Sequence, residues 1–265
     1  RCGAMIFAVA EFLGVDEMLG LSTKEALVDT SRIRGPGIHK SGFTGRSPGR
    51  LAVTYHIQNM VGEGAFGTVL AVAHQKTNRK AVCKVIKKDT VKDENLVRNE
   101  IAILQTLDHP KIVRIFEYFE DDNSFQIVFE RIVGGDLQKE IGESYGGLSV
   151  RRVAHYMRQV LLAINYCHGL TEPIVHRDLK PANVMKLSCS SYSDIKVIDF
   201  GLSALTGQSS STKACGTPVF MAPEAFDGKH GKAVDLWAVG MMMYYMLVKS
   251  LPFDAQGCRG VDEFM

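Results

Sequence analysis

The pattern of apolar and polar positions changes character partway along the chain. From Tyr55 to Phe129, short apolar runs of strand-like composition are separated by turn residues. We expect strands at residues 55–61, 67–74, 80–86, 112–119 and 125–129. One helix is expected among them, at residues 91–107, with Thr90 as its N-cap and apolar residues at helical spacing.

Beyond Gly134 and Gly135 the pattern is mainly helical. Residues 149–168 carry apolar side chains at helical spacing, and residues 233–248 are apolar throughout, as in a buried helix. Between them, a loop and strand region at residues 176–200 is followed by a loop rich in serine and threonine. A β-rich part followed by a helical part predicts an α+β fold with two lobes, and the cleft between two lobes is a natural ligand site.

The domain boundaries follow from the same pattern. Residues 31–50 are rich in glycine, serine and arginine, which is typical of a flexible basic linker. We therefore assign residues 1–54 to a partly disordered N-terminal extension. The folded domain is expected at residues 55–265, and it comprises an N-lobe (55–130), a hinge (130–136) and an incomplete C-lobe (137–265). Because the chain starts without methionine, we expect a fragment.

Composition narrows the class of partners. The 265 residues include 31 Lys plus Arg against 29 Asp plus Glu, which gives no reason to expect a nucleic-acid or anionic-membrane partner. The longest apolar run, residues 236–248, is too short to span a bilayer. The six cysteines show no C-x-x-C pair and no ligand-like spacing to histidine. We therefore expect reduced thiols and a cytoplasmic or nuclear location.

Three glycines mark a candidate phosphate loop. Residues 62–69, GEGAFGTV, space Gly62, Gly64 and Gly67 as G-x-G-x-x-G. Glycines there would let backbone amides approach phosphate oxygens that a Cβ would obstruct. The alternative is a plain hairpin turn, and the string alone does not decide between the two. Its position between two expected strands argues against a dinucleotide-binding fingerprint, which would open a helix.

A lysine interrupts an otherwise apolar expected strand. Lys84 follows Ala81, Val82 and Cys83. It could be an edge-strand residue that favours solubility. Alternatively, it could reach the phosphates of a nucleotide and be steadied by Glu100 on the helix that follows.

Two further strings carry the strongest chemical signal, HRDLKPAN at residues 176–183 and DFG beginning at Asp199. Asp178 would accept the proton of an attacking hydroxyl, and Lys180 would offset charge on a transferring phosphoryl group. Asn183 and Asp199 would bind magnesium. Each string alone could be a turn with a solvated acid, but their order and context argue against that interpretation.

In this order, the strings resemble those of eukaryotic protein kinases from about Tyr55 to the end of the chain. APE at 222–224 and DLW at 235–237 extend the match. Lys180, together with GTP at 216–218, is similar to the serine/threonine branch. The sequences of residues 130–136, of the helix before His176 and of residues 107–113 resemble the calcium/calmodulin-regulated group, especially calcium-dependent protein kinases. The resemblance implies a bilobal protein-kinase-like fold, ATP and Mg2+ as cofactors, and serine or threonine acceptors in protein substrates.

The resemblance also implies a nucleotide site. The backbone at Glu130 and Ile132 would bond adenine, with Phe129 at the back of the pocket, and Asp136 would reach the ribose or a basic substrate residue. The residues implied to sandwich the base are Val61, Val69, Val82 and Met185. Arg177 could pair with a phosphorylated residue of the following loop, although that loop could instead be merely flexible. The candidates are Ser203, Thr206, Ser209, Ser210, Ser211 and Thr212.

The chain departs from the family pattern at several points. Val82 stands where alanine is usual, and Ala182 replaces a glutamate common in relatives that prefer basic substrates, so that preference is in doubt. The arginine that normally pairs with the residue matching Glu224 is expected beyond Met265, and its absence favours inactivity of this particular chain. No EF-hand loop is present, so any calcium sensor or calmodulin site is expected outside this sequence.

Two other functions remain as alternatives. A non-catalytic kinase-like scaffold would bind partners only, and the intact Lys84, Asp178, Asn183 and Asp199 argue against it. A small-molecule kinase could share the fold. The strings GTP and APE are typical of a platform for a polypeptide substrate and argue against that alternative.

Overall fold

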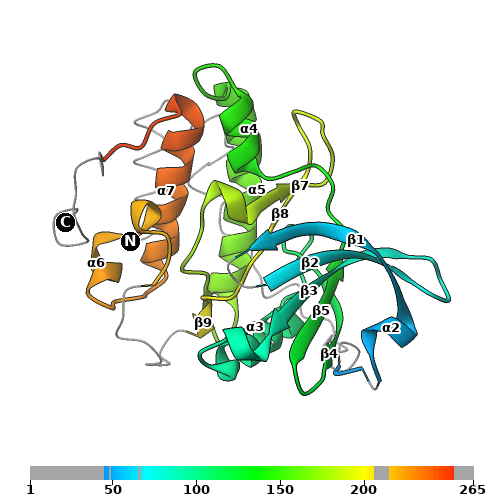
Figure 1. Cartoon of the computed structure of the whole chain (residues 1–265). Coiled ribbons are helices and arrows are strands. Elements are labelled where there is room, and N and C mark those ends of the chain that lie inside the picture. The colour runs from blue at the N-terminus through cyan, green and yellow to red at the C-terminus, as the bar shows by residue number, and fades with distance from the viewer. Residues whose placement is uncertain (1–44, 48, 65–66, 206–214, 254–265) are drawn as a thin grey trace. The chain divides into compact units, whose positions relative to one another are not determined.

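The computed structural model describes residues 45–47, 49–64, 67–205 and 215–253, and every structural statement below refers to these (Figure 1). They divide into two compact units. The sheet unit comprises residues 45–108 and 112–132, and the helical unit comprises residues 109–111 and 133–253. A β-rich unit and a mainly helical unit confirm the predicted fold class.

The sheet unit contains one antiparallel sheet of five strands in the order β1-β2-β3-β5-β4. The strands are β1 (Tyr55–Gly64), β2 (Gly67–His74), β3 (Lys80–Lys87), β4 (Ile115–Glu120) and β5 (Ser124–Glu130). All five were predicted, although β4 begins later than expected. Consecutive strands mostly lie side by side, as short connections favour.

The two faces of this sheet carry different sets of side chains. One face buries a hydrophobic cluster consisting of Leu51, Tyr55, Val72, Ala81, Cys83, Phe119 and Val128. Because strand side chains alternate, Val82 and Lys84 project from the opposite face. The register pairs Lys84 with Val69 and Val82 with Phe129, so these four side chains share that face.

The helix of the sheet unit, α3 (Glu94–Thr106), starts later than predicted. The prediction of Thr90 as its N-cap was wrong. Thr90 ends a separate turn, η3 (Lys88–Thr90), where its hydroxyl donates to the carbonyl oxygen of Lys87 at 2.8 Å. Asp93 caps α3 instead, and its carboxylate accepts from the amide of Asn95 at 2.9 Å.

Part of the predicted N-terminal linker belongs to the sheet unit. Arg46 forms a parallel bridge with Tyr118, and the Ser47 amide donates to the Tyr118 carbonyl oxygen at 2.9 Å. The short helix α2 (Leu51–Thr54) follows, and Leu51 is buried in the cluster described above. Regular structure therefore begins slightly before Tyr55. The rest of the predicted extension, residues 1–44, lies outside the described residues.

The helical unit is built on α5 (Val150–Gly169) and α7 (Ala233–Val248), which pack against each other. Both were predicted to within a residue. The shorter helices α4 (Leu137–Glu143) and α6 (Pro223–Phe226) were not. α5 is amphipathic, whereas α7 buries side chains on all sides, because it passes through the core of the unit.

Two small ribbons and two short turns frame the loops of this unit. β6 (Ile174–Val175) pairs with β9 (Ala204–Leu205), and β7 (Val184–Lys186) pairs with β8 (Ile195–Val197). The turns are η4 (Pro181–Asn183) and η5 (Pro218–Phe220). Each ribbon flanks the predicted catalytic strings, so the ribbons fix where those loops begin and end.

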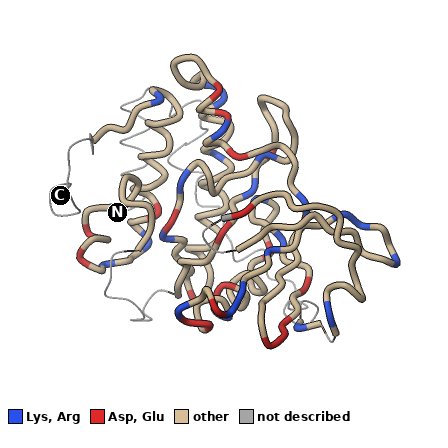
Figure 2. Tube along the Cα trace, viewed as in Figure 1, with Lys and Arg blue, Asp and Glu red and all other residues tan. Residues whose placement is uncertain are grey.

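Charge is distributed evenly on the chain. Acidic and basic positions are interspersed along the described trace (Figure 2). Among the described helices, none is both long and apolar enough to cross a membrane.

Candidate functional site

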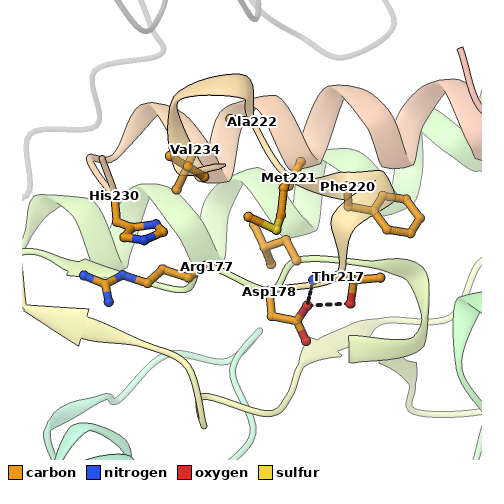
Figure 3. A pocket seen from close by; sticks show the side chains of 11 residues that line it. Arg177, Asp178, Thr217, Phe220, Met221, Ala222, His230 and Val234 are labelled. Atoms are coloured by element: carbon orange, nitrogen blue, oxygen red, sulfur yellow. Dashed lines mark hydrogen bonds between the residues drawn. The ribbon is translucent and has the colours of Figure 1, made fainter. Parts of the chain in front are cut away.

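The Asp178 carboxylate is held by four donor atoms within the helical unit. Its Oδ1 accepts from the amide of Thr217 at 2.9 Å and from the Thr217 hydroxyl at 2.7 Å (Figure 3). Its Oδ2 accepts from Lys180 Nζ at 2.7 Å and from Asn183 Nδ2 at 3.1 Å. The side chain is 10% exposed. Charge-assisted bonds of this kind fix the orientation of a carboxylate.

The backbone beside Asp178 is strained, and a second buried carboxylate supports it. Arg177 has φ of 70°, a conformation that is uncommon outside glycine. Asp235, on α7, is 1% exposed and accepts from the amides of His176 and Arg177, both at 2.9 Å. His168 Nε2 lies 2.8 Å from the same carboxylate. These bonds offset the strain and lock the loop.

His176 fills the space under the loop in a defined tautomer. Its Nε2 lies 3.1 Å from the carbonyl oxygen of Ile198, and the Asp178 amide lies 3.3 Å from its Nδ1. A carbonyl can only accept and an amide N–H can only donate, so the neutral Nε2–H tautomer satisfies both contacts. The ring packs on buried Phe200 with centroids 4.7 Å apart. The histidine thus supports the loop through its ring contacts.

The two predicted metal ligands lie at the ends of paired strands: Asn183 directly precedes β7, and Asp199 follows β8. The Ile198 amide donates to the carbonyl oxygen of Asn183 at 2.9 Å, which extends the β7–β8 ladder toward Asp199. Asn183 Nδ2 donates to the Asp178 carbonyl oxygen at 2.8 Å, so its Oδ1 is the atom suited to ligation. Asp199 has φ of 61°, and its Oδ1 lies 3.4 Å from the Gly201 amide.

Magnesium fits this pair of oxygen ligands. The described residues contain no group of three or more His, Cys, Asp or Glu side chains that could hold a metal by themselves. Mg2+ typically uses one or two protein oxygens and completes its shell with water and substrate phosphates. An amide oxygen and a carboxylate at the end of one ribbon match that requirement.

The predicted phosphorylation segment is described only in part. Ser203 is 3% exposed and its hydroxyl donates to the His176 carbonyl oxygen at 3.3 Å, so it is poorly placed as a phosphate acceptor. The other candidates, Thr206 and residues 209–212, lie outside the described residues. Arg177 Nε is buried and has no hydrogen-bond partner among the residues that the structure describes.

Asp136 and Met185 come together in the helical unit through an isolated antiparallel bridge. The Asp136 carboxylate accepts from the amide of Lys139 at 2.8 Å and caps α4. Sequence reasoning missed this structural role. The signal was available, because an aspartate directly before a helical segment is a common N-cap.

In the sheet unit, Lys84 and Glu100 form the predicted ion pair. Lys84 Nζ lies 2.9 Å from Glu100 Oε1, and the side chains are 17% and 6% exposed. β3 lies between β2 and β5 in the sheet. The alternative interpretation of Lys84 as an edge-strand residue is therefore wrong. A cation on a central strand needs a partner, and α3 supplies it.

The glycine string contains glycines of two kinds. Gly67 has φ of 127°, and a Cβ there would lie 2.1 Å from the Val85 carbonyl oxygen, so packing alone requires glycine. A Cβ on Gly62 would meet nothing within 4 Å. The hairpin therefore does not explain Gly62, whereas open space over the strand would suit a ligand. Gly64 pairs with Gly67 at the end of the hairpin, and residues 65–66 lie outside the described residues.

The remaining predicted nucleotide residues of the sheet unit lie along its strands. Val61 is 57% exposed, and Phe129 is 8% exposed. The Glu130 amide donates to the Arg114 carbonyl oxygen at 3.0 Å, so only its carbonyl oxygen could meet a base. Val69, Val82 and Ile132 are partly buried.

Comparison with known proteins gives the context of this geometry. Residues 55–263 match the family model described as protein kinase domain. The chain is 38% identical over 202 residues to calcium/calmodulin-dependent protein kinase type 1 of Macrobrachium nipponense, covering 75% of this chain and 58% of that protein. It is 33% identical over 197 residues to calcium-dependent protein kinase 5 of Plasmodium berghei (strain Anka), covering 74% and 34%.

A plant relative extends the range of similar proteins. The chain is 36% identical over 214 residues to SNF1-related protein kinase catalytic subunit alpha KIN12 of Arabidopsis thaliana, covering 79% of this chain and 42% of that protein. The chain thus spans between 34% and 58% of the length of these three curated relatives.

Proposed function

Because the chain belongs to the protein kinase domain family, we propose that its parent protein transfers the γ-phosphoryl group of ATP to serine or threonine hydroxyls of protein substrates. The main support is the Asp178 carboxylate, which four donor atoms hold in place beside Lys180. A carboxylate held in this way can orient an incoming hydroxyl, and catalysis of phosphoryl transfer rests on positioning together with electrostatic stabilisation.

Each residue near Asp178 has a distinct role in the proposed reaction. The acceptor hydroxyl oxygen bonds to the γ-phosphorus while the bond from that phosphorus to the β,γ-bridging oxygen breaks, and ADP leaves. Asp178 accepts the hydroxyl proton. The Lys180 ammonium, 2.7 Å from Asp178 Oδ2, offsets negative charge on the phosphoryl group during transfer. Thr217 fixes the other carboxylate oxygen.

The nucleotide contacts that the family resemblance implies are assigned residue by residue. Asn183 and Asp199 would hold Mg2+, which supplies charge neutralisation on the phosphates when bound. Lys84, steadied by Glu100, would bind α- and β-phosphate oxygens. Gly62, Gly64 and Gly67 would line the phosphates, and the adenine would meet the backbone of Glu130 and Ile132. Its apolar contacts would be Val61, Val69, Val82, Phe129 and Met185, and Asp136 would reach the ribose.

The names of the similar proteins support a proposal about regulation. Several are calcium/calmodulin-dependent or calcium-dependent protein kinases. We assign any calcium sensor or calmodulin site to parts of the parent protein outside this sequence. The scattered thiols support a cytoplasmic or nuclear location for it.

Transfer of radiolabelled phosphate to a mixed peptide library by the complete parent protein tests the function. The Asp178→Asn variant should lose at least about 100-fold in rate, since a general base contributes that much or more. Asp227→Asn is the control, because that carboxylate is 56% exposed and forms a surface pair with Lys229. Equal rates for wild type and Asp178→Asn would overturn the mechanism.

The same experiment distinguishes the binding-only alternative. A scaffold that binds nucleotide would be stabilised by Mg-ATP in a thermal-shift titration and yet transfer no phosphate. A catalyst would show both properties.

A further inference from the structure

A buried charge cluster lies in the helical unit away from Asp178. Glu140, on α4, is 9% exposed, and its Oε2 lies 2.7 Å from Nζ of Lys186 on β7. Its Oε1 contacts Nη2 of Arg152 on α5, and the Tyr156 hydroxyl lies 3.1 Å from the same oxygen. One carboxylate therefore joins three separate elements.

The cluster is better explained by positioning than by stability. Burying a charged pair typically brings no net gain over apolar side chains of the same size, because desolvation offsets the attraction. The contacts do impose a definite geometry on the elements that they join. Tyr156 has no exposed surface, and burial raises the pKa of its hydroxyl to about 12, so it remains a neutral group beside the carboxylate. These four residues were not singled out by any motif in the sequence.

The strand that this cluster holds lies next to proposed nucleotide residues of the helical unit, because β7 contains Met185 and directly follows Asn183. Lys186 directly follows Met185 and lies three residues beyond Asn183. Its backbone is fixed as well, because its amide donates to Gly135 O at 2.8 Å and its carbonyl oxygen accepts from Gly134 N at 2.9 Å.

Gly134 shows how closely these backbones approach. A Cβ there would lie 2.5 Å from the Lys186 carbonyl oxygen and 2.3 Å from that of Ser188. The segment before α4 is thus pressed against β7, and the bridge between Asp136 and Met185 continues the contact. The Lys186 side chain fastens β7 to α4, while its backbone fastens β7 to the segment that leads into α4.

We propose that Glu140 and Lys186 are positioning residues for nucleotide binding. Their ion pair holds β7 against α4 so that Met185, Asp136 and Asn183 keep the spacing that a bound nucleotide and its Mg2+ require. The proposal rests on the proposed function, and it adds residues that touch neither nucleotide nor substrate.

The expected effect separates binding from chemistry. In Lys186→Met, a side chain of similar length lacks the charge, so the side-chain link between β7 and α4 is lost while the backbone bonds to Gly134 and Gly135 remain. The KM for Mg-ATP, and the Kd for Mg-ADP measured by calorimetry, should rise about 10-fold, as is typical for residues that support ligating groups. The kcat at saturating Mg-ATP should change less than about 3-fold, because Thr217, Lys180 and Asn183 still orient Asp178.

Two further variants keep the test specific. Lys139→Met removes a lysine from α4, the helix that carries Glu140. The Lys139 side chain is 70% exposed and forms a surface pair with Glu143 at 3.9 Å, so KM and Kd should stay at wild-type values. Glu140→Gln combined with Lys186→Met should raise Kd by less than the two single changes added together, since both remove the Glu140–Lys186 pair. All assays use the complete parent protein well below its melting temperature.

Each outcome has a definite meaning. If wild type binds Mg-ADP and Lys186→Met binds it equally well, the positioning role is wrong while the proposed function stands. A fall in kcat equal to the rise in Kd, or additive effects in the double variant, would also overturn it. If wild type binds no Mg-nucleotide at all, the proposed function itself fails.

Discussion

The Asp178 carboxylate and the Lys84 ammonium are held in very different ways in their two units. Asp178 lies in an irregular loop, next to a residue with positive φ, and four donor atoms and the buried Asp235 support that region. Lys84 lies on a central strand in regular register, and the bond that fixes it here is to Glu100.

The difference shows two ways of placing a charged group. In the sheet unit, alternation along a strand and periodicity along a helix already bring lysine and glutamate together. In the helical unit, no regular element dictates the loop conformation, so buried polar contacts must impose it. Removing a single contact from such a loop should therefore lower the free energy of unfolding more than removing one from a strand does.

The largest expected effect is on the support of the loop. Asp235→Asn would place an amide group where a carboxylate accepts from two backbone amides and approaches His168. The free energy of unfolding should fall by about 3 to 5 kcal/mol, because buried donors lose a charged acceptor. Urea unfolding measures it, with Asp194→Asn as the control, since that side chain is 59% exposed. A loss no larger than the control's would contradict the comparison.

A smaller effect is expected in the sheet unit. Lys84→Met leaves the Glu100 carboxylate, which is 6% exposed, without its lysine. We expect a loss of about 2 to 3 kcal/mol, below that of Asp235→Asn because Lys84 still reaches solvent in part. Glu100→Gln combined with Lys84→Met should recover stability relative to the single lysine variant. If the double variant were no more stable than Lys84→Met, then Lys84 and Glu100 would not be each other's main partners.

The two glycines of the hairpin give a matched test. Gly67→Ala should cost about 2 kcal/mol, because φ is 127° and the new Cβ would meet the Val85 carbonyl oxygen. Gly62→Ala should change stability by less than about 0.5 kcal/mol, since the space around it is open. Gly62→Ala should nevertheless weaken Mg-ADP binding if phosphates approach its backbone. Equal stability losses would remove the distinction between a packing glycine and a ligand glycine.

The sequence predicts most of the regular structure but little of the polar support. The five strands, α5 and α7 follow from composition and periodicity, and the Lys84–Glu100 pair follows from a strand and a helix placed in order. The start of α3 did not follow, because Thr90 and Asp93 are both good caps and only the local turn decides between them.

The buried polar residues that support the loop and β7 could not be predicted from the sequence. Asp235 stands in an apolar helix and was noticed only as part of a string, whereas its three contacts come from segments distant in the chain. Glu140 and Lys186 carry no local signal at all. Contacts between distant side chains depend on tertiary packing, which local pattern does not encode.

The smallest expected effect concerns two buried thiols, one in each unit, and the stability of the protein at alkaline pH. Burial raises the pKa of Cys83, in the sheet unit, and of Cys167, in the helical unit, from 9.0 to about 12 each. Between these values the unfolded chain has lost protons that the folded chain keeps, so stability falls as pH rises above 9. At pH 9.5 the loss should be below about 1 kcal/mol per thiol, and Cys83→Ala should remove its share of the slope. An unchanged slope in that variant would show that the thiol proton is not linked to folding of the sheet unit.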